Sequence, residues 1–171
     1  MVTSTTKSSA PAPKFQVIAC GLPRTGTTTT GRALSILLNG PVWDGGADSY
    51  NGSPTRQRQL LSLASHCPIR TPSDRKQVLD LLSAFTTGCV ASTDQPGCYF
   101  IEELLELYPR ATVICTVRER ESWWGSYTAL WRSIYEISTH PLLFLSPSLK
   151  RFCTFSFAFY KRVPQAVEME A

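Results

Sequence analysis

Short apolar runs alternate with amphipathic stretches along this chain, and that alternation is typical of a sheet covered by helices. Residues 15–20 form a partly β-branched apolar run that stops at Gly21, so a buried strand is predicted there. Residues 27–38 follow with helically spaced apolar positions and end at an Asn-Gly-Pro stop, which predicts a helix. Strand, glycine turn and helix together predict the first part of a β-α-β unit.

The rest of the chain continues this alternation. Further helices are predicted at about 55–65, 72–86, 100–108 and 121–138, and further strands at 89–93 and 111–117. Residues 41–54 are rich in Gly, Ser and Asp and are predicted to be a loop. The fold class expected from this order is α/β: a three-layer P-loop fold in which a parallel sheet is flanked by helices. An aromatic stripe near the C-terminus is expected to pack on the sheet; it comprises Phe152, Phe155, Phe157, Phe159 and Tyr160.

The chain length of 171 residues, 43% of them hydrophobic, suits one domain, which we place at residues 14–171. Residues 1–13 are rich in Ser, Thr, Pro and Ala and are expected to form a disordered tail. The sequence has neither a secretory signal nor an apolar run near the ~20 residues that span a bilayer. We therefore expect a cytoplasmic protein without a transmembrane segment. The net charge of +4 suits a small polyanion better than a nucleic acid.

The six cysteines form no CxxC pair and have only two histidines beside them, which argues against a zinc site or a disulfide framework. Cys20, Cys89 and Cys115 fall in or beside predicted strands and are expected to be buried thiols. No metal is expected. His66 and His140 precede Cys67-Pro68 and Pro141, so both are interpreted as loop residues without a catalytic role.

The most informative segment connects the first strand to the first helix. It reads Gly21-Leu-Pro-Arg24-Thr25-Gly26-Thr27-Thr28, with the G-x-x-x-x-G spacing of a phosphate-binding loop. Such glycines let successive backbone N–H groups point inward, and the helix N-terminus adds a positive dipole. Thr27 stands where the usual loop has lysine, and the cation comes earlier, as Arg24. The alternative is a glycine-rich turn without a ligand.

A second cation, Arg118, follows the strand predicted at 111–117, and Ser126 comes eight residues later. The carboxyl end of a parallel strand is where open α/β sheets bind ligands, so both residues are candidates for a second phosphate contact. A nucleotide triphosphatase would need an Asp for Mg²⁺, a role that Asp94 could fill. The absent loop lysine argues against that alternative, a P-loop nucleotide kinase or NTPase.

Both motifs resemble those of sulfotransferases that use 3′-phosphoadenosine 5′-phosphosulfate (PAPS). Arg24-Thr-Gly-Thr-Thr28 is similar to the family's 5′-phosphosulfate loop, and Val117–Ser126 is similar to its 3′-phosphate motif. The resemblance covers about residues 15–135 and is closest to a compact microbial branch with a Gly-x-x-Arg-Thr-Gly-Thr loop. It implies that PAPS is the co-substrate, held by Gly21, Arg24, Thr25, Gly26, Thr27, Thr28, Arg118 and Ser126.

The resemblance also implies a general base for the acceptor. In the better-known family members a histidine ends the strand that precedes the 3′-phosphate strand, and this chain has Asp94 at the corresponding place. Asp94 is the candidate catalytic base, with Arg24 as its catalytic partner; alternatively, Asp94 caps the helix that begins near Cys98. Trp123, Trp124, Trp131, Tyr127 and Tyr135 are expected to be packing residues rather than an acceptor cage.

The function expected from the resemblance is transfer of a sulfuryl group to a hydroxyl or amine of a small metabolite, as in secondary metabolism. The acceptor pocket is expected to be built from residues 41–56 and 128–150. Family members continue for several further elements, so a C-terminally truncated, non-catalytic P-loop protein that binds a nucleotide or partner is the alternative hypothesis. The acceptor and the oligomeric state do not follow from the sequence.

Overall fold

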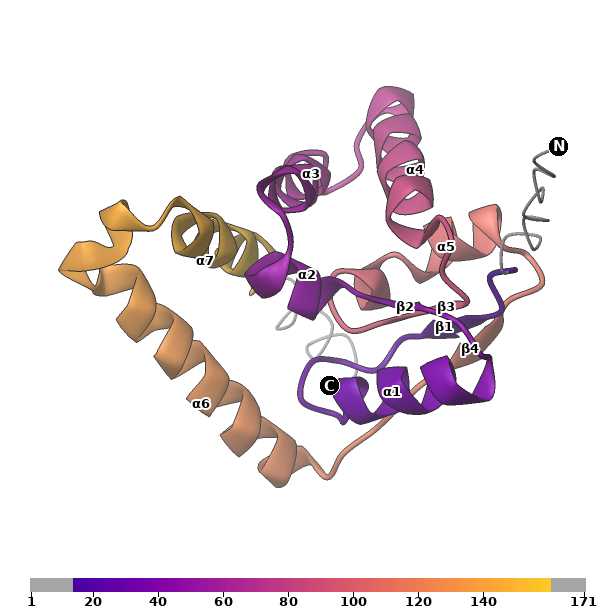
Figure 1. Cartoon of the computed structure of the whole chain (residues 1–171), viewed down its shortest axis with the longest axis horizontal. Helices are drawn as coiled ribbons and strands as arrows, with labels where there is room; N and C mark the ends of the chain where they lie inside the picture. Colours follow the sequence, from indigo (N-terminus) through magenta and orange to yellow (C-terminus); the bar gives the residue numbers. More distant parts are fainter. Residues whose placement is uncertain (1–13, 161–171) are drawn as a thin grey trace, which may run out of the picture.

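The computed structural model describes residues 14–160. It contains four parallel strands in the order β2-β3-β1-β4, with bounds β1 Val17–Ala19, β2 Val42–Asp44, β3 Ala91–Thr93 and β4 Thr112–Ile114 (Figure 1). The helices are α1 Thr27–Leu37, α2 Gly45–Asn51, α3 Pro54–Ser65, α4 Pro72–Thr86, α5 Ile101–Leu107, α6 Arg120–Thr139 and α7 Pro147–Tyr160, with short 3₁₀ turns η1 Gly97–Tyr99 and η2 Pro141–Leu145. The tail expected at 1–13, and the end of the domain at 161–171, lie outside the described residues.

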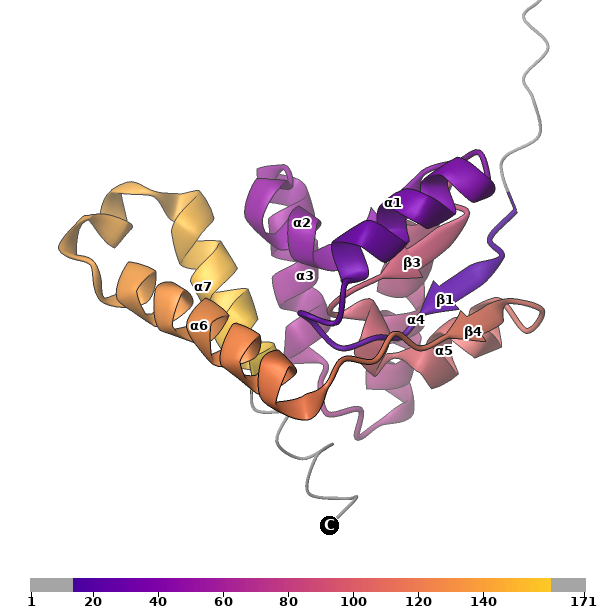
Figure 2. The same ribbon diagram turned by 90° about the horizontal axis from the view of Figure 1, so that it is seen from below.

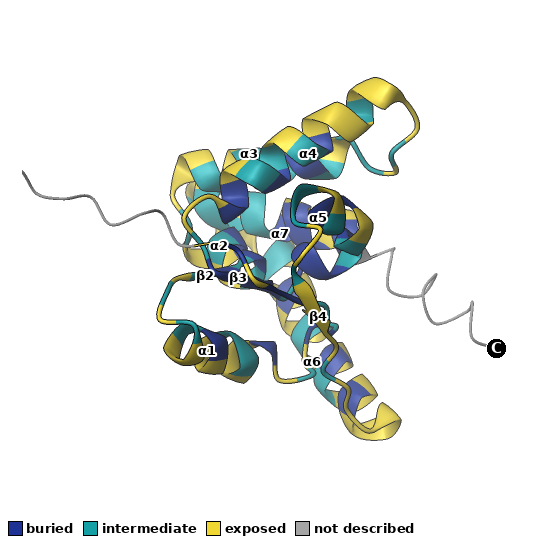
Figure 3. Cartoon of the chain, turned by 90° about the vertical axis from the view of Figure 1, so that its right-hand side faces the viewer, coloured by how far each residue is buried: buried dark blue, intermediate teal, exposed yellow. Residues whose placement is uncertain are grey.

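Helices cover both faces of the sheet, as the three-layer fold class predicted. Figure 3 shows α1 on one face and α3, α4, α5 and α7 on the other. Alternate residues of β1 point to opposite faces: Val17 and Ala19 pack with Leu34 of α1, whereas Ile18 joins the larger core that includes Phe85 of α4. The pattern of strand, turn and helix therefore produced the expected layers.

The helices begin where side chains can bind their free N–H groups. Thr71 and Asp74 form a capping box at the start of α4, and Ser53 caps α3 by accepting a hydrogen bond from the backbone N–H of Arg56. Asp44 caps α2 in the same way, through a 2.9 Å bond from the N–H of Ala47. The prediction of a loop at 41–54 was therefore wrong: its polar residues include the cap of a helix.

The C-terminal aromatic stripe lies on α7, and its packing partners are mainly helices. Phe155 and Phe159 are buried in the large core, where Phe159 packs on Tyr99 and Phe100. Figures 1 and 2 show α6 extending away from the sheet and the chain returning along α7. The elements packed most extensively against α7 are α2, α3 and α6, and Phe155 and Phe159 share the large core with Ile18 of β1 and Trp43 of β2.

The prediction that Cys20, Cys89 and Cys115 are buried was wrong. Cys20 and Cys89 are half-buried, and Cys115 is exposed, because it follows β4, an edge strand of the described sheet whose three residues are all exposed. Cys20 and Cys115 follow the paired residues Ala19 and Ile114 at the ends of β1 and β4. Among the described residues, which include all six cysteines, no disulfide bond is formed.

Candidate functional site

The site lies where the strand order reverses. The chain leaves β1 towards β2 on one side of the sheet, and it leaves β3 towards β4 on the other. In an open parallel sheet, this arrangement opens a crevice at the carboxyl ends of the two central strands. The glycine loop follows β1, and Asp94 follows β3 directly, so the topology brings both sequence candidates to one crevice.

The glycine loop ends at an uncapped helix. Gly26 is the N-cap of α1 with a φ of 97°, and it has no side-chain cap; the first turn carries no acidic residue. A side chain at Gly21 would clash with Thr116, since a Cβ would lie 1.9 Å from the Thr116 hydroxyl oxygen. The first N–H groups of α1 thus remain available to an anion, and the helix dipole favours it.

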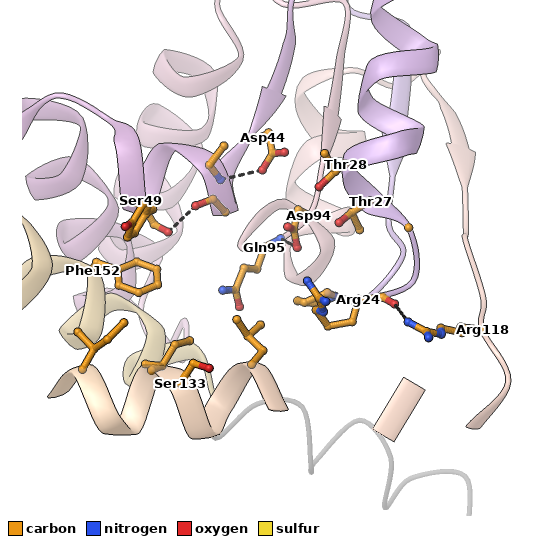
Figure 4. A pocket seen from close by; sticks show the side chains of 18 residues that line it. Arg24, Thr27, Thr28, Asp44, Ser49, Asp94, Gln95, Arg118, Ser133 and Phe152 are labelled. Carbon is orange, nitrogen blue, oxygen red and sulfur yellow. Dashed lines mark hydrogen bonds between the residues drawn. The ribbon is translucent and has the colours of Figure 1, made fainter. Parts of the chain in front are cut away.

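Arg24 connects the loop to two later segments. Its Nε donates a 2.9 Å hydrogen bond to the hydroxyl of Ser126 on α6, and its carbonyl accepts a 3.2 Å bond from Nη1 of Arg118. Arg24 has a φ of 74°, a left-handed conformation that costs free energy in a non-glycine residue. Both guanidinium groups are exposed towards the crevice mouth (Figure 4). Two cations from distant segments therefore meet at the turn that precedes α1.

Trp123 holds α6 against this loop. Its indole Nε1 donates a buried 2.9 Å hydrogen bond to the carbonyl of Pro23, and its ring stacks on Tyr127. Both rings are buried, as expected of packing residues, whereas Trp124 and Tyr135 are exposed at 52% and 62%. The packing expectation was therefore right for the first pair and wrong for the second.

Asp94 lies in a tight turn after β3, with a φ of 63°. Its Oδ1 accepts a 2.8 Å hydrogen bond from the N–H of Gln95, and its Oδ2 lies so near Gly46 that a Cβ there would be 2.7 Å away. Burial, with a smaller contribution from the Asp44 carboxylate, raises the pKa of Asp94, whereas the Gln95 N–H, the Thr27 hydroxyl and Arg24 lower it; the net pKa is about 6.

The capping alternative for Asp94 does not match this geometry. The N-cap position of η1 is Pro96, and no side chain caps that turn within the described part of the chain. The backbone carbonyl of Asp94, not its carboxylate, accepts the bond from the N–H of Cys98. The carboxylate is left with one face towards the crevice.

A cavity of about 610 Å³ occupies the crevice (Figure 4). One end is formed by the glycine loop, Asp94 and Arg118, and the other end by α2, α6 and Phe152 of α7. The lining residues are Pro23, Arg24, Gly26, Thr27, Thr28, Asp44, Gly46, Ala47, Ser49, Tyr50, Asp94, Gln95, Arg118, Leu130, Ser133, Ile134, Ile137 and Phe152. The cavity therefore has a polar, cationic end and a largely apolar end.

Most of the site residues expected from the sequence meet in this cavity, and three do not line it. Gly21 packs closely against Thr116 beside the loop. The Thr25 hydroxyl donates a 2.7 Å hydrogen bond to the Leu22 carbonyl and shares a 2.8 Å hydrogen bond with the Thr116 hydroxyl. Ser126 contacts Arg24 instead. Arg118 follows β4 by four residues, because that strand ends at Ile114 rather than at residue 117.

Residues of the two segments expected to build the acceptor pocket, 41–56 and 128–150, line the largely apolar end of the cavity. The lining residues of the first segment lie in or beside α2, where a loop had been predicted, and those of the second lie on α6. Sequence reasoning missed Gln95 and Phe152 as lining residues. The signal for Gln95 was its place beside Asp94 at a strand end. His66 and His140 lie outside this cavity: His66 pairs with Asp74 at 3.2 Å, and His140 caps η2.

Comparison with known proteins agrees with this architecture. A family profile described as a sulfotransferase domain matches residues 16–170, so the chain belongs to the sulfotransferase domain family. A 30-residue segment is 57% identical to the "Ava biosynthesis cluster protein M" of Aspergillus versicolor. That match covers 18% of this chain and 12% of the Aspergillus protein.

Within residues 14–160, no group of three or more His, Cys, Asp or Glu side chains is arranged to hold a metal ion. In the same range, no helix combines the length and the apolar character that crossing a bilayer requires.

Proposed function

We propose that this protein transfers a sulfuryl group from PAPS to a hydroxyl or amine of a small metabolite. The observation that carries the proposal is the meeting of Arg24 and Arg118 at the uncapped N-terminus of α1, linked by the bond from Arg118 to the Arg24 carbonyl. Membership of the sulfotransferase domain family supports a transferase activity. The name of the Aspergillus relative, a biosynthesis cluster protein, supports a small-metabolite acceptor.

The two cationic groups suit a donor with two anionic ends. Arg24, the first N–H groups of α1 and the hydroxyls of Thr27 and Thr28 would hold the 5′-phosphosulfate, because a helix N-terminus favours anions. Arg118 would hold the 3′-phosphate. Ser126 would assist by orienting Arg24, because its hydroxyl accepts a hydrogen bond from the Arg24 Nε. The 3′-phosphate is the group that separates this donor from ATP.

The transfer then needs a base and charge stabilisation. The acceptor oxygen forms a bond to sulfur while the bond from sulfur to the bridging oxygen breaks, which releases 3′-phosphoadenosine 5′-phosphate. The acceptor proton passes to Asp94, whose raised pKa of about 6 lies near the pH at which a general base works best. Arg24 and the loop N–H groups stabilise the charge on the sulfuryl and bridging oxygens.

Calorimetry with 3′-phosphoadenosine 5′-phosphate, in the absence of Mg²⁺, tests the donor. We expect Arg118→Ala to weaken this binding by about 10- to 100-fold, the loss typical of one charge-assisted contact to a phosphate. Arg132→Ala is the matched control, because Arg132 is an exposed arginine of α6 that does not line the cavity. The affinity of this variant for the bisphosphate should equal that of the wild type.

The same titration separates the competing functions. Tighter binding of ATP with Mg²⁺ than of the bisphosphate would overturn the proposal in favour of a nucleotide kinase or NTPase. Bisphosphate binding without turnover of ³⁵S-labelled PAPS, over a panel of phenols, alcohols and amines, would favour a non-catalytic P-loop protein. Equal affinity of the Arg118→Ala variant would remove Arg118 from the site.

A further inference from the structure

Gln95 is a buried amide without a side-chain partner. The residue as a whole is 9% exposed, and within the described residues its side-chain amide forms no hydrogen bond; its backbone N–H donates to Asp94. Figure 4 shows this amide directed into the cavity, between Asp94 and the wall that contains Ser133. The amide is thus presented at the cavity wall, where a molecule in the cavity can form hydrogen bonds with it.

The neighbouring polar side chains of this part of the cavity have internal partners. Asp44 accepts the N–H of Ala47 at 2.9 Å, and the Ser49 hydroxyl donates to the carbonyl of Gly46 at 2.7 Å. The Ser133 hydroxyl donates to the carbonyl of Ala129 at 3.2 Å. Two lining side chains at this end, Gln95 and Tyr50, keep hydrogen-bonding capacity that the described contacts do not use. Tyr50 is 52% exposed and Gln95 only 9%, so Gln95 is the largely enclosed group of the two.

Apolar side chains surround this amide. Leu130, Ile134 and Ile137 of α6 face the cavity from one side, and Phe152 of α7 faces it from another. The Phe152 ring is itself fixed edge-to-face against Tyr50, with centroids 5.2 Å apart. A wall of this kind favours a ring-shaped or aliphatic body, and one isolated amide sets its orientation.

We propose that Gln95 is the specificity-determining residue for the acceptor, an apolar ring compound with two polar groups. One hydroxyl or amine lies at Asp94 and is sulfated, and the second group, a hydroxyl, hydrogen-bonds to the Gln95 amide. This inference rests on the proposed function, since Asp94 is taken as the base. Gln95 can impose the orientation because its own backbone N–H holds the Asp94 carboxylate at 2.8 Å.

Paired acceptors test this proposal. Equilibrium binding of 2-naphthol and of 2,6- and 2,7-dihydroxynaphthalene is measured on protein saturated with 3′-phosphoadenosine 5′-phosphate. We expect the wild type to bind at least one diol about 5- to 10-fold more tightly than 2-naphthol, the gain typical of one neutral hydrogen bond, after correction for the two equivalent hydroxyls. Gln95→Met, which keeps the length of the side chain and removes the amide, should bring the ratio close to one.

Three controls keep the outcomes distinct. Gln77→Met makes the same substitution at an exposed position of α4 and should keep the wild-type ratio. Gln95→Asn keeps an amide on a side chain that is one carbon shorter, so the amide no longer reaches the second hydroxyl. This variant should lose the preference for the diol, and it provides the test if the methionine variant folds poorly. Bisphosphate affinity reports on the donor site in each variant.

The outcomes separate this inference from the proposed function. If the bisphosphate binds but the wild type shows no preference for the diol, or Gln95→Met retains that preference, this inference is wrong and the proposed function stands. If the bisphosphate does not bind, the proposed function fails, and this inference fails with it.

Discussion

Replacing Asp94 by asparagine is expected to lower the rate of sulfuryl transfer by a factor of about 10²–10⁴, the usual contribution of a general base. The amide has the shape of the carboxylate and can still accept the Gln95 N–H, but it cannot take the acceptor proton. Affinity for 3′-phosphoadenosine 5′-phosphate should stay within a few-fold of wild type. Single-turnover kinetics with ³⁵S-labelled PAPS, beside calorimetry, measures both quantities.

The pH profile gives an independent test of the same residue. A base acts in its ionised form, so wild-type kcat/KM should rise with pH and level off above an apparent pKa near 6, the raised pKa of Asp94. In Asp94→Asn this limb should disappear from the residual activity. A residual profile with the same limb at pH 6 would assign the titration to another group.

The stability of the Asp94→Asn variant should move in the opposite direction to its activity. The pKa of Asp94 in the folded protein, about 6, lies above its ordinary value of 3.8, so the folded state holds the proton more tightly than the unfolded chain. That stabilisation is fully present below pH 4 and is lost as the pH rises through 6. Asparagine does not ionise, so the variant should be more stable than wild type at pH 8, by about 2 kcal/mol, and nearly equal at pH 4.

Urea unfolding at the two pH values measures this difference. Asp80→Asn, at an exposed position of α4 paired with Lys76, is the control and should change stability little at either pH. A capping aspartate would behave in the reverse manner, because its loss removes a hydrogen bond and destabilises the protein at pH 8. Lower stability of Asp94→Asn at pH 8 would therefore restore the capping interpretation.

Local sequence signals accounted for the part of the site that is built locally. The β-branched run, the glycines and the apolar spacing after Thr27 are all contained in residues 15–38, so β1, the loop and α1 could be predicted from them. The sequence also singled out Arg24 and Arg118 as candidate anion-binding residues, and the structure brings the two together. Their approach could be anticipated only because the carboxyl ends of parallel strands share one edge of a sheet.

Features that depend on tertiary neighbours could not be predicted in this way. The run at 111–117 is apolar and suggested a buried strand, yet Val113 is 42% exposed because β4 lies at the edge of the described sheet. The polar residues at 41–54 suggested a loop, but Asp44 caps α2, and Ser49 accepts a hydrogen bond at its carbonyl from Gln57 of α3. The Gln95 amide faces the cavity because of the turn after β3, and the hydrophobic pattern of the sequence does not predict the geometry of that turn.

Truncating Phe85 to alanine is expected to destabilise the protein by about 3–5 kcal/mol, the range for a fully buried aromatic ring. Phe85 of α4 is 0% exposed, and its ring stacks on Trp43 of β2 with centroids 5.1 Å apart and planes within 4°. The Arg56 guanidinium covers the same ring at 4.7 Å. Alanine would leave a cavity between the indole and the cation that neither can fill without moving.

Urea unfolding of this variant, with Ile36→Ala as the control, measures the loss. Ile36 of α1 is 76% exposed, so its truncation should change the unfolding free energy by less than about 0.5 kcal/mol. A loss below about 1 kcal/mol for Phe85→Ala would mean that the ring is not enclosed as described, since even partial collapse around a lost aromatic ring costs more.

The same substitution should affect the two ends of the cavity unequally. Trp43 lies directly before Asp44, the cap of α2, and α2 lines the end of the cavity that we propose for the acceptor. The glycine loop is instead fastened by Thr116 and by the bond from Trp123 to Pro23, which are distant from this ring in the chain and belong to other elements. Under conditions where Phe85→Ala remains folded, we therefore expect the KM for the acceptor to rise several-fold while bisphosphate affinity stays near wild type. Equal losses of acceptor and bisphosphate affinity would contradict this expectation. They would mean that the packing of Phe85 supports the glycine loop as well as α2.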